Sequence, residues 1–169
     1  MATVVSAKFD FALRFAEAFS GNFAEGGPGR FFDLSGLQTT RLANGTSAGQ
    51  VDKCHVRKDA AISGGGTADV EFVASLLDSE GAAITFAKIK VLMFYNSGTV
   101  SIKIKAKTGD ALPWFDGTTD SVVLKAGDCL PFFSPIGITV AGATSSITIT
   151  NTSGGTAAAY TMFVAGTSV

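Results

Sequence analysis

The sequence predicts an all-β protein, built as an antiparallel β-sandwich or jelly roll with an N-terminal arm. Short β-branched runs are separated by clusters of Gly, Ser, Thr and Ala, which is the pattern of many short strands. The runs recur at intervals of about 8 to 12 residues, as in sandwiches, with turns such as "LKAGD" and "NTSGG" between them. At 169 residues, the chain is long enough to bury a sizeable core as one domain.

The N-terminal part differs in composition from the rest. We expect an aromatic-rich arm with the first strands over residues 1–45, and the sandwich over residues 46–169. Seven of the 14 phenylalanines fall between positions 9 and 32, around the turn-rich break "GNFAEGGPGR". Alternation with polar residues favours a strand near Phe11, although one helix face would also fit. The arm residues that we expect to contact the domain or a neighbouring subunit are Phe9, Phe11, Phe15 and Phe19.

Residues 84–95 and 100–107 are the clearest strands, and the turn "NSGT" predicts that they pair as a hairpin. If Tyr95 lies opposite Val100, one register places Ile89, Val91 and Met93 with their apolar partners on one face, and lysines on the other. Such a cationic face would be solvated, or would contact an acidic protein surface or a nucleic-acid backbone. The lysines lack interleaved aromatics, which argues against stacking of single strands. The lysines concerned are Lys88, Lys90, Lys103, Lys105 and Lys107.

The remaining strands follow the same pattern. In "SITIT", Ile147 and Ile149 are expected to point inward, with Thr148 outward. The segment "VASLLDSEG", residues 73–81, is compatible with one helical turn or a loop. The other expected strands are 121–126, 129–133, 137–141, 146–152 and 158–166.

Cys54 and His55 are neighbours in the sequence and invite a catalytic or metal-binding interpretation. The segment around them looks extended, so the thiol and the imidazole should point to opposite faces and make no nucleophile–base pair. His55 is the only histidine, and a zinc site needs three or four ligands. We therefore expect His55 to belong to a basic, solvated or interface-facing stripe with Lys53 and Arg57.

Other motifs do not indicate chemistry. Asp110, Asp116 and Asp120 lie in a turn-rich segment, but their spacing fits no EF-hand and favours turn capping. "ISGGGTAD" and "NTSGGTA" match neither a Walker A loop nor GxGxxG. The net charge of −1 provides no global attraction to nucleic acid or anionic membranes. We expect no enzymatic activity, cofactor or metal, no direct nucleic-acid or membrane contact, and synthesis in a cytoplasm without a signal peptide.

Residues 42–96 carry a resemblance to a group of virion proteins of tailed phages and prophages. "LANGTSAGQVD" is similar to the group's "LANGTGAGQ-D" segment, and residues 73–90 are similar to "DLAGxLTDAFGxxLTFAxVK". "KAGDCLPFF", "TVAGATSSITITN" and "YTMFVAG" resemble later segments of the group in the same order. The likeness spans roughly residues 42–166. It departs at "EFVASLLDSEG" and at Cys129, where the group commonly has a small or apolar residue.

The resemblance implies a structural protein of the virion. Small head decoration (cement) proteins of this type sit on the assembled capsid, commonly as trimers, and contact the major capsid protein. The implied function is stabilisation of the phage head through contacts that bridge subunits, with the chain located at the capsid surface. A tail, baseplate or fibre component is the alternative, for which Trp114 and Phe115 would be candidate receptor or glycan contacts. A hydrolase is the third hypothesis, and no pair of carboxylates singles it out.

Overall fold

The structure of the chain, a computed structural model, describes residues 6–8, 14–16, 31–33, 41–77, 81–107, 120–140 and 145–168. All regular elements in these ranges are strands, and within them no helix is long and apolar enough to cross a membrane. The strands are β1 (Ser6–Lys8), β2 (Arg14–Ala16), β3 (Phe31–Asp33), β4 (Arg41–Asn44), β5 (Gln50–Val51), β6 (Lys53–Ile62), β7 (Thr67–Glu71), β8 (Val73–Leu77), β9 (Ala83–Asn96), β10 (Ile102–Ala106), β11 (Ser121–Leu124), β12 (Cys129–Thr139), β13 (Ser146–Asn151) and β14 (Ala158–Ser168).

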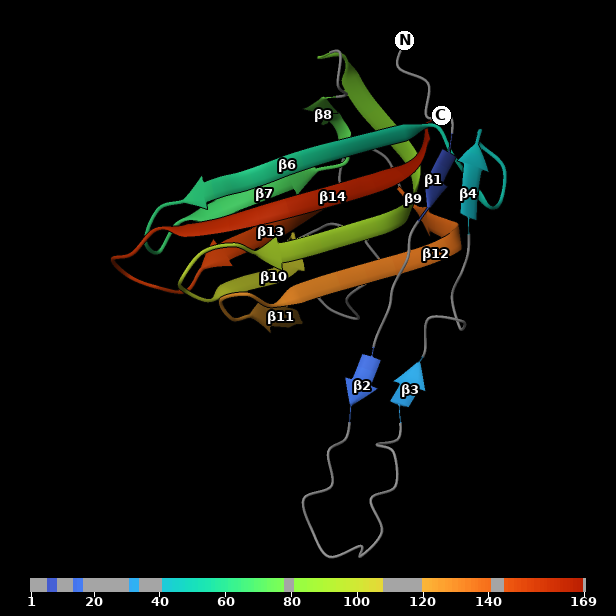
Figure 1. Cartoon of the computed structure of the whole chain (residues 1–169). Helices are drawn as coiled ribbons and strands as arrows, with labels where there is room; N and C mark the ends of the chain where they lie inside the picture. Colours follow the sequence, from blue (N-terminus) through green and yellow to red (C-terminus); the bar gives the residue numbers. More distant parts are fainter. Residues whose placement is uncertain are drawn as a thin grey trace, which may run out of the picture.

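Two antiparallel sheets pack face to face and form a β-sandwich (Figure 1). One sheet has four strands in the order β11-β10-β13-β7, and the other has the order β12-β9-β14-β6, with β8 paired to β9. Consecutive strands from β6 to β14 change sheet, except for the paired neighbours β8–β9 and β10–β11. The all-β, antiparallel prediction is confirmed. The strand order is compatible with a jelly roll, which stays a prediction, as do the arm and the division at residue 45.

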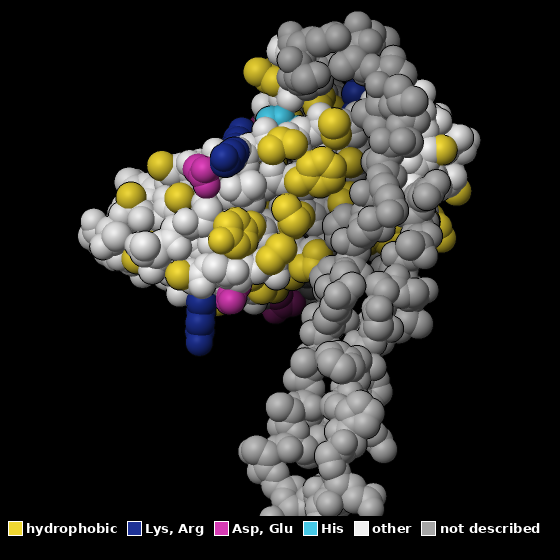
Figure 2. Space-filling model, viewed as in Figure 1, with side chains coloured by type: hydrophobic (Ala, Val, Ile, Leu, Met, Phe, Trp, Pro, Cys, Tyr) yellow, Lys and Arg dark blue, Asp and Glu magenta, His cyan; other side chains and the backbone are white. Residues whose placement is uncertain are grey.

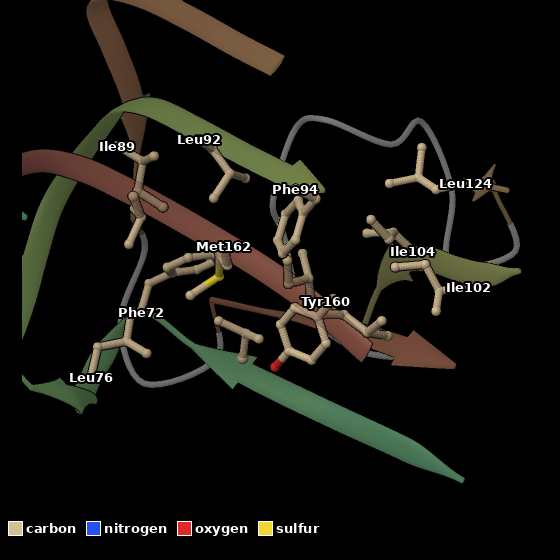
Figure 3. Close-up of a cluster of buried hydrophobic side chains, with 14 of the residues drawn as sticks. Phe72, Leu76, Ile89, Leu92, Phe94, Ile102, Ile104, Leu124, Tyr160 and Met162 are labelled. Atoms are coloured by element: carbon tan, nitrogen blue, oxygen red, sulfur yellow. The ribbon is translucent and has the colours of Figure 1, made fainter. Parts of the chain in front are cut away.

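The core lies between the two sheets, and alternation along each strand accounts for it. On the four-stranded sheet, Ile102 and Ile104 of β10 and Ile147 and Ile149 of β13 are buried, as expected from their period of two. The five-stranded sheet contributes larger side chains, which Figure 3 shows gathered in one cluster. Those labelled there from the five-stranded sheet and the segment that leads to it are Phe72, Leu76, Ile89, Leu92, Phe94, Tyr160 and Met162.

The expected hairpin of residues 84–95 with residues 100–107 is wrong. Both segments are strands, but β9 pairs with β8, β12 and β14, whereas β10 pairs with β11 and β13 in the opposite sheet. Asn96 explains why the chain crosses over. Its side-chain amide donates to the carbonyls of Val100 and Leu124, at 2.9 and 3.0 Å, and its Oδ1 accepts from the amide of Gly98 at 3.1 Å. These bonds hold a corner between the sheets in place of a hairpin turn.

A bulge at Lys90 changes which residues of β9 face the core. Val91 pairs with Ala165 and Ile89 pairs with Gly166, so Lys90 is an extra residue on β9. Beyond the bulge, Leu92 and Phe94 point into the core, and the intervening residues point to the outer face. The expectation that Ile89, Val91 and Met93 share one inner face is therefore wrong for the last two.

Two further segments differ from expectation. Residues 73–77 form strand β8, which pairs with the start of β9, instead of a helical turn or loop. The sequence predicts separate strands over residues 129–133 and 137–141, but β12 runs through from Cys129 to Thr139. Its pairing with β9 is interrupted after Phe133 and resumes at Ile138, opposite the bulge of β9.

The N-terminal strands form two small sheets outside the sandwich layers. In the first, β4 lies between β1, which is antiparallel to it, and β5, which is parallel. We call this three-stranded sheet the covering sheet, because its Leu42 and Val51 pack on the outer face of the five-stranded sheet. In the second, β2 pairs with β3. Phe15 lies in β2, whereas Phe9, Phe11 and Phe19 fall outside the described residues.

Candidate interaction surface

The outer face of the five-stranded sheet presents rows of residues that run across its strands. One row consists of Cys54, Ala165, Val91 and Phe133 on β6, β14, β9 and β12. Leu42 and Val51 complete this apolar cluster, in which Val91 and Ala165 are 2% and 1% exposed. We call it the covered row, because the chain's own covering sheet shields it from solvent.

The next row on this face is equally apolar but is not shielded in the same way. It consists of Val56, Phe163, Met93 and Pro131, which are register partners across the same four strands. Val56 is 60% exposed, Pro131 is exposed, and Met93 and Phe163 are half-buried. We call it the open row. Figure 2 shows hydrophobic side chains gathered on this face of the molecule.

A third row extends the apolar area toward the far end of the sheet. Thr161, Tyr95 and Cys129 are partners across β14, β9 and β12. Tyr95 is 39% exposed, and Cys129 is also exposed. An antiparallel sheet that faces water normally alternates apolar residues inside with polar residues outside. The covered row and the open row carry no charge and depart from this alternation, whereas the third row includes Thr161, which bonds to Asp59.

Lys90 fastens the covering sheet to the five-stranded sheet. Its side chain is 1% exposed, and its Nζ donates to the carbonyl oxygens of Ser47 and Gln50 at 2.5 and 2.6 Å. The first carbonyl belongs to the turn between β4 and β5, and the second to the first residue of β5. Burial, and then the nearby charge of Lys88, lower the pKa of the Lys90 amine, while Asp52 opposes this shift. Lys90 is thus an internal anchor and not part of a solvated cationic face.

The five lysines of the expected patch do not share one surface. Lys103 and Lys105 lie on the outer face of the four-stranded sheet, whereas Lys88 and Lys90 belong to β9 in the other sheet. Their predicted common face followed from the hairpin, and it is wrong for the same reason. A role of these lysines and of the four arm phenylalanines in a partner interface stays a prediction.

The outer face of the four-stranded sheet carries paired charges. The Nζ of Lys107 lies 2.9 Å from Oδ2 of Asp69 and 3.5 Å from Oε1 of Glu71. The hydroxyl of Thr148 donates to Oδ1 of Asp69 at 2.7 Å. The hydrogen bond from Lys107, and then that from Thr148, lower the pKa of Asp69. On this face, Lys107, Asp69, Glu71 and Thr148 are thus paired with one another within the chain.

Cys54 and His55 point to opposite sides of β6, as predicted. Cys54 packs in the covered row, whereas the Nδ1 of His55 lies 2.7 Å from the carbonyl oxygen of Leu77. The Nε2 of His55 is buried and has no hydrogen-bond partner among the described residues. Lys53, His55 and Arg57 are all half-buried, and Arg57 donates to the hydroxyl of Tyr160 at 3.2 Å, so this stripe is not fully solvated, and its alternative role in an interface stays a prediction. These contacts connect β6 to β8 and β14.

The described residues show no arrangement suited to catalysis or metal binding. Within them, no group of three His, Cys, Asp or Glu side chains could hold a metal ion. Of the segment 110–120, only Asp120 is described, so the predictions for its other residues lie outside the described ranges. An apolar cavity of about 170 Å³ lies between the sheets, without the converging polar groups of a substrate site. Its lining is Leu92, Phe94, Ile104, Val122, Leu130, Pro131, Phe132 and Ile147.

Reasoning from the sequence missed the open row, although a signal for it exists. In "AAYTMFVAG", the core residues Tyr160, Met162 and Val164 alternate with Thr161, Phe163 and Ala165, so both faces are largely apolar. The segment "VLMFY" of β9 has the same character. Continuous apolar runs of this kind are typical of strands that are covered on both faces. The apolar character of this outer face could therefore have been predicted from the sequence.

Comparisons with known proteins add little to this description. No protein-family model matches the chain, and no curated protein matches it either. One similar solved structure is described as "Crystal structure of PirA", with 12% sequence identity and a TM-score of 0.38. The match covers 69% of this chain and 95% of that chain. A likeness this weak supports no statement about function.

Proposed function

We propose that this chain is a structural virion protein, a decoration or cement protein that binds the assembled head of a tailed phage. The observation that carries the proposal is the open row of Val56, Phe163, Met93 and Pro131. It is an apolar strip on the outer face of one sheet, whereas the outer face of the other sheet is polar. Such a face functions as an interface within an assembly.

The resemblance of residues 42–166 to phage virion proteins supports the same proposal. It specifies the kind of assembly, which the open row alone does not. The partner is the major capsid protein of the same virion, and the chain acts as a homo-oligomer, expected to be a trimer, at the capsid surface. The proposal includes no catalytic step, cofactor, nucleic-acid contact or membrane contact.

The mechanism follows from mass action. A ligand that binds only the assembled shell stabilises it by an amount that grows with the ligand's concentration relative to its dissociation constant. Each bound copy would bury an interface of at least about 1,000 Å². The stabilisation from many copies would then add up over the whole shell. The sandwich supplies a rigid body for this purpose, and the apolar face supplies the buried area.

The proposal is tested on virions that contain this chain. Gold-labelled antibodies against the chain should decorate the heads in electron micrographs. Heads assembled without the chain should form, should release their genome at lower temperature, and should regain resistance when the purified full chain is added. Labelling confined to the tail, baseplate or fibres would refute the decoration role and support the alternative of a tail component.

A further inference from the structure

The apolar cavity between the sheets lies at one long side of the sandwich. β11 is an edge strand of the four-stranded sheet, and β12 is an edge strand of the five-stranded sheet. Figure 1 shows these two strands along the same side of the molecule. Val122 of β11 and Leu130 of β12 both line the cavity and are half-buried. The cavity is therefore accessible from solvent between the two edge strands.

The floor of the cavity is formed by buried core residues. Phe94, Ile104 and Ile147 lie on β9, β10 and β13, and each is at most 1% exposed. Val122 is the register partner of Ile104, so it faces the same interior. β11 is four residues long and β12 is eleven, so fewer side chains reach inward from the β11 edge. The cavity is thus part of the packed sandwich and has walls from both sheets.

The lining is chemically uniform, because all eight residues that line the cavity have apolar side chains. A buried water molecule needs about two to four polar partners, which these side chains do not provide. The volume is about 170 Å³. Elsewhere, a cavity of about 150 Å³ lined by Leu, Ile and Phe stays dry and binds benzene or xenon. The cavity of this chain has a similar size and the same kind of lining.

Size and lining together define the class of ligand. A volume of about 170 Å³ lies below the roughly 300–1,000 Å³ of sites for drug-sized molecules, so it accommodates one small group. A charged or strongly polar ligand would lose its hydration and gain no hydrogen bond from the lining side chains. An apolar ligand would gain dispersion contacts with walls that are otherwise unfilled.

We propose that this cavity is a binding site for one small, neutral, apolar molecule of about the size of a single aromatic ring. The rings of Phe94 and Phe132 and the aliphatic walls hold the ligand by dispersion and by excluding water, with no side chain that orients it through a hydrogen bond. Of the open row, Pro131 also lines the cavity. The site goes beyond the proposed function and does not rest on it.

The first test measures selectivity on the unmodified full chain, with benzene as the probe. Isothermal titration calorimetry should show one benzene bound per chain. Phenol has a similar size but should bind at least tenfold more weakly, because its hydroxyl group would be buried without a partner. Biphenyl, which has two rings, should not bind. A chain that does not bind benzene, or that binds phenol or biphenyl as tightly as benzene, would overturn the inference.

The second test locates the bound benzene with two neighbouring valines of β11. Val122 lines the cavity, whereas Val123 is 53% exposed on the outer face. Val122→Phe adds a ring that occupies the cavity and should lower the affinity for benzene at least tenfold, while Val123→Phe should leave it unchanged. Circular dichroism without benzene checks that both variants fold, and Leu130→Phe replaces Val122→Phe if that variant does not. Equal benzene affinities of the cavity variant and Val123→Phe would contradict the proposal.

Both tests use the purified chain without phage particles, so their outcomes are separate from those of the proposed function. A chain that decorates phage heads but does not bind benzene would refute the ligand site and leave the decoration role intact. A chain that binds benzene in the cavity but labels only the tail would support the site and refute the decoration role.

Discussion

The two outer faces of the sandwich have the same architecture but opposite chemistry. On the four-stranded sheet, Lys107, Asp69 and Thr148 form a connected set of ion pair and hydrogen bond. On the five-stranded sheet, the outward positions of the open row are Val, Phe, Met and Pro. Along the strands of both sheets, these outward residues alternate with residues that point into the same core. The difference fits our proposal, in which the four-stranded face meets water and the five-stranded face meets protein.

The five-stranded face also shows how the chain begins to cover itself. Leu42 and Val51 shield one row, and Lys90 holds them there through two backbone carbonyls. The next row is covered less, since its Phe163 packs against the same cluster whereas Val56 is 60% exposed. In our proposal, the cover of the covered row belongs to the fold of one chain, and the cover of the open row comes from the assembly.

The largest expected effect comes from removing the side chain that covers the first row. Leu42→Ala deletes a side chain that is 1% exposed, which should lower the free energy of unfolding by about 2–5 kcal/mol. The control is Val123→Ala, at a 53% exposed position on the other outer face, which should lower the free energy of unfolding by no more than about 0.5 kcal/mol. Denaturant titrations of both variants provide the comparison. Equal losses would show that the covering sheet contributes nothing to the fold.

A smaller effect is expected at the anchor. Lys90→Met keeps most of the packing volume but removes both hydrogen bonds of the buried amine, while the carbonyl of Ser47 keeps its bond from the amide of Gln50 at 3.1 Å. A hydrogen bond to a charged group contributes about 1.5–3 kcal/mol, so this variant should lose about that amount of stability. Lys105→Met, on the outer face of the four-stranded sheet, serves as the control and should be close to neutral. Similar values for both lysines in urea titrations would contradict the role of Lys90 as an anchor.

The smallest effect is expected on the polar face and depends on pH. The pKa of Asp69 is lowered from its ordinary value of 3.8, chiefly by the hydrogen bond from Lys107. A carboxyl group with a lowered pKa adds stability above its ordinary pKa and loses it as the pH falls through the lowered value. Asp69→Asn should therefore be slightly less stable than wild type at neutral pH.

The pH dependence provides the control for that variant. The stability difference between wild type and Asp69→Asn should stay constant above about pH 4 and shrink at lower pH. It should remain well below the Lys90→Met effect, because Asp69 and Lys107 are both more than a third exposed. Thermal unfolding at several pH values measures it. A difference that grows on acidification would show that the ion pair does not stabilise the fold.

The strands could be predicted from the sequence, but their pairing could not. Period-two patterns identify β9, β10, β13 and β14, because each buries one face in the core. Those patterns are the same whether two strands pair side by side or face each other across a sandwich. The aligned lysines of β9 and β10 therefore predict a hairpin, whereas the side chain of Asn96 turns the chain into the other sheet.

The open row could not be predicted from the sequence because of a second local feature, the bulge in β9. The bulge at Lys90 exchanges the two faces of β9, so Val91 and Met93 point outward although alternation from Ile89 places them inward. A bulge depends on pairing with β12 and β14, and nothing in the local sequence marks it. The apolar character of both faces of β14, and of the "VLMFY" segment of β9, was the signal in the sequence for an apolar outer surface.

The central claim is that the five-stranded face, and not the four-stranded face, is buried when the protein assembles. The most direct test is incorporation of Val56→Lys and Val123→Lys into phage particles, each in competition with the wild-type chain and measured by quantitative mass spectrometry of purified virions. The account predicts that Val123→Lys is incorporated as efficiently as wild type, and that Val56→Lys is depleted at least tenfold. Equal incorporation of the two variants would contradict it.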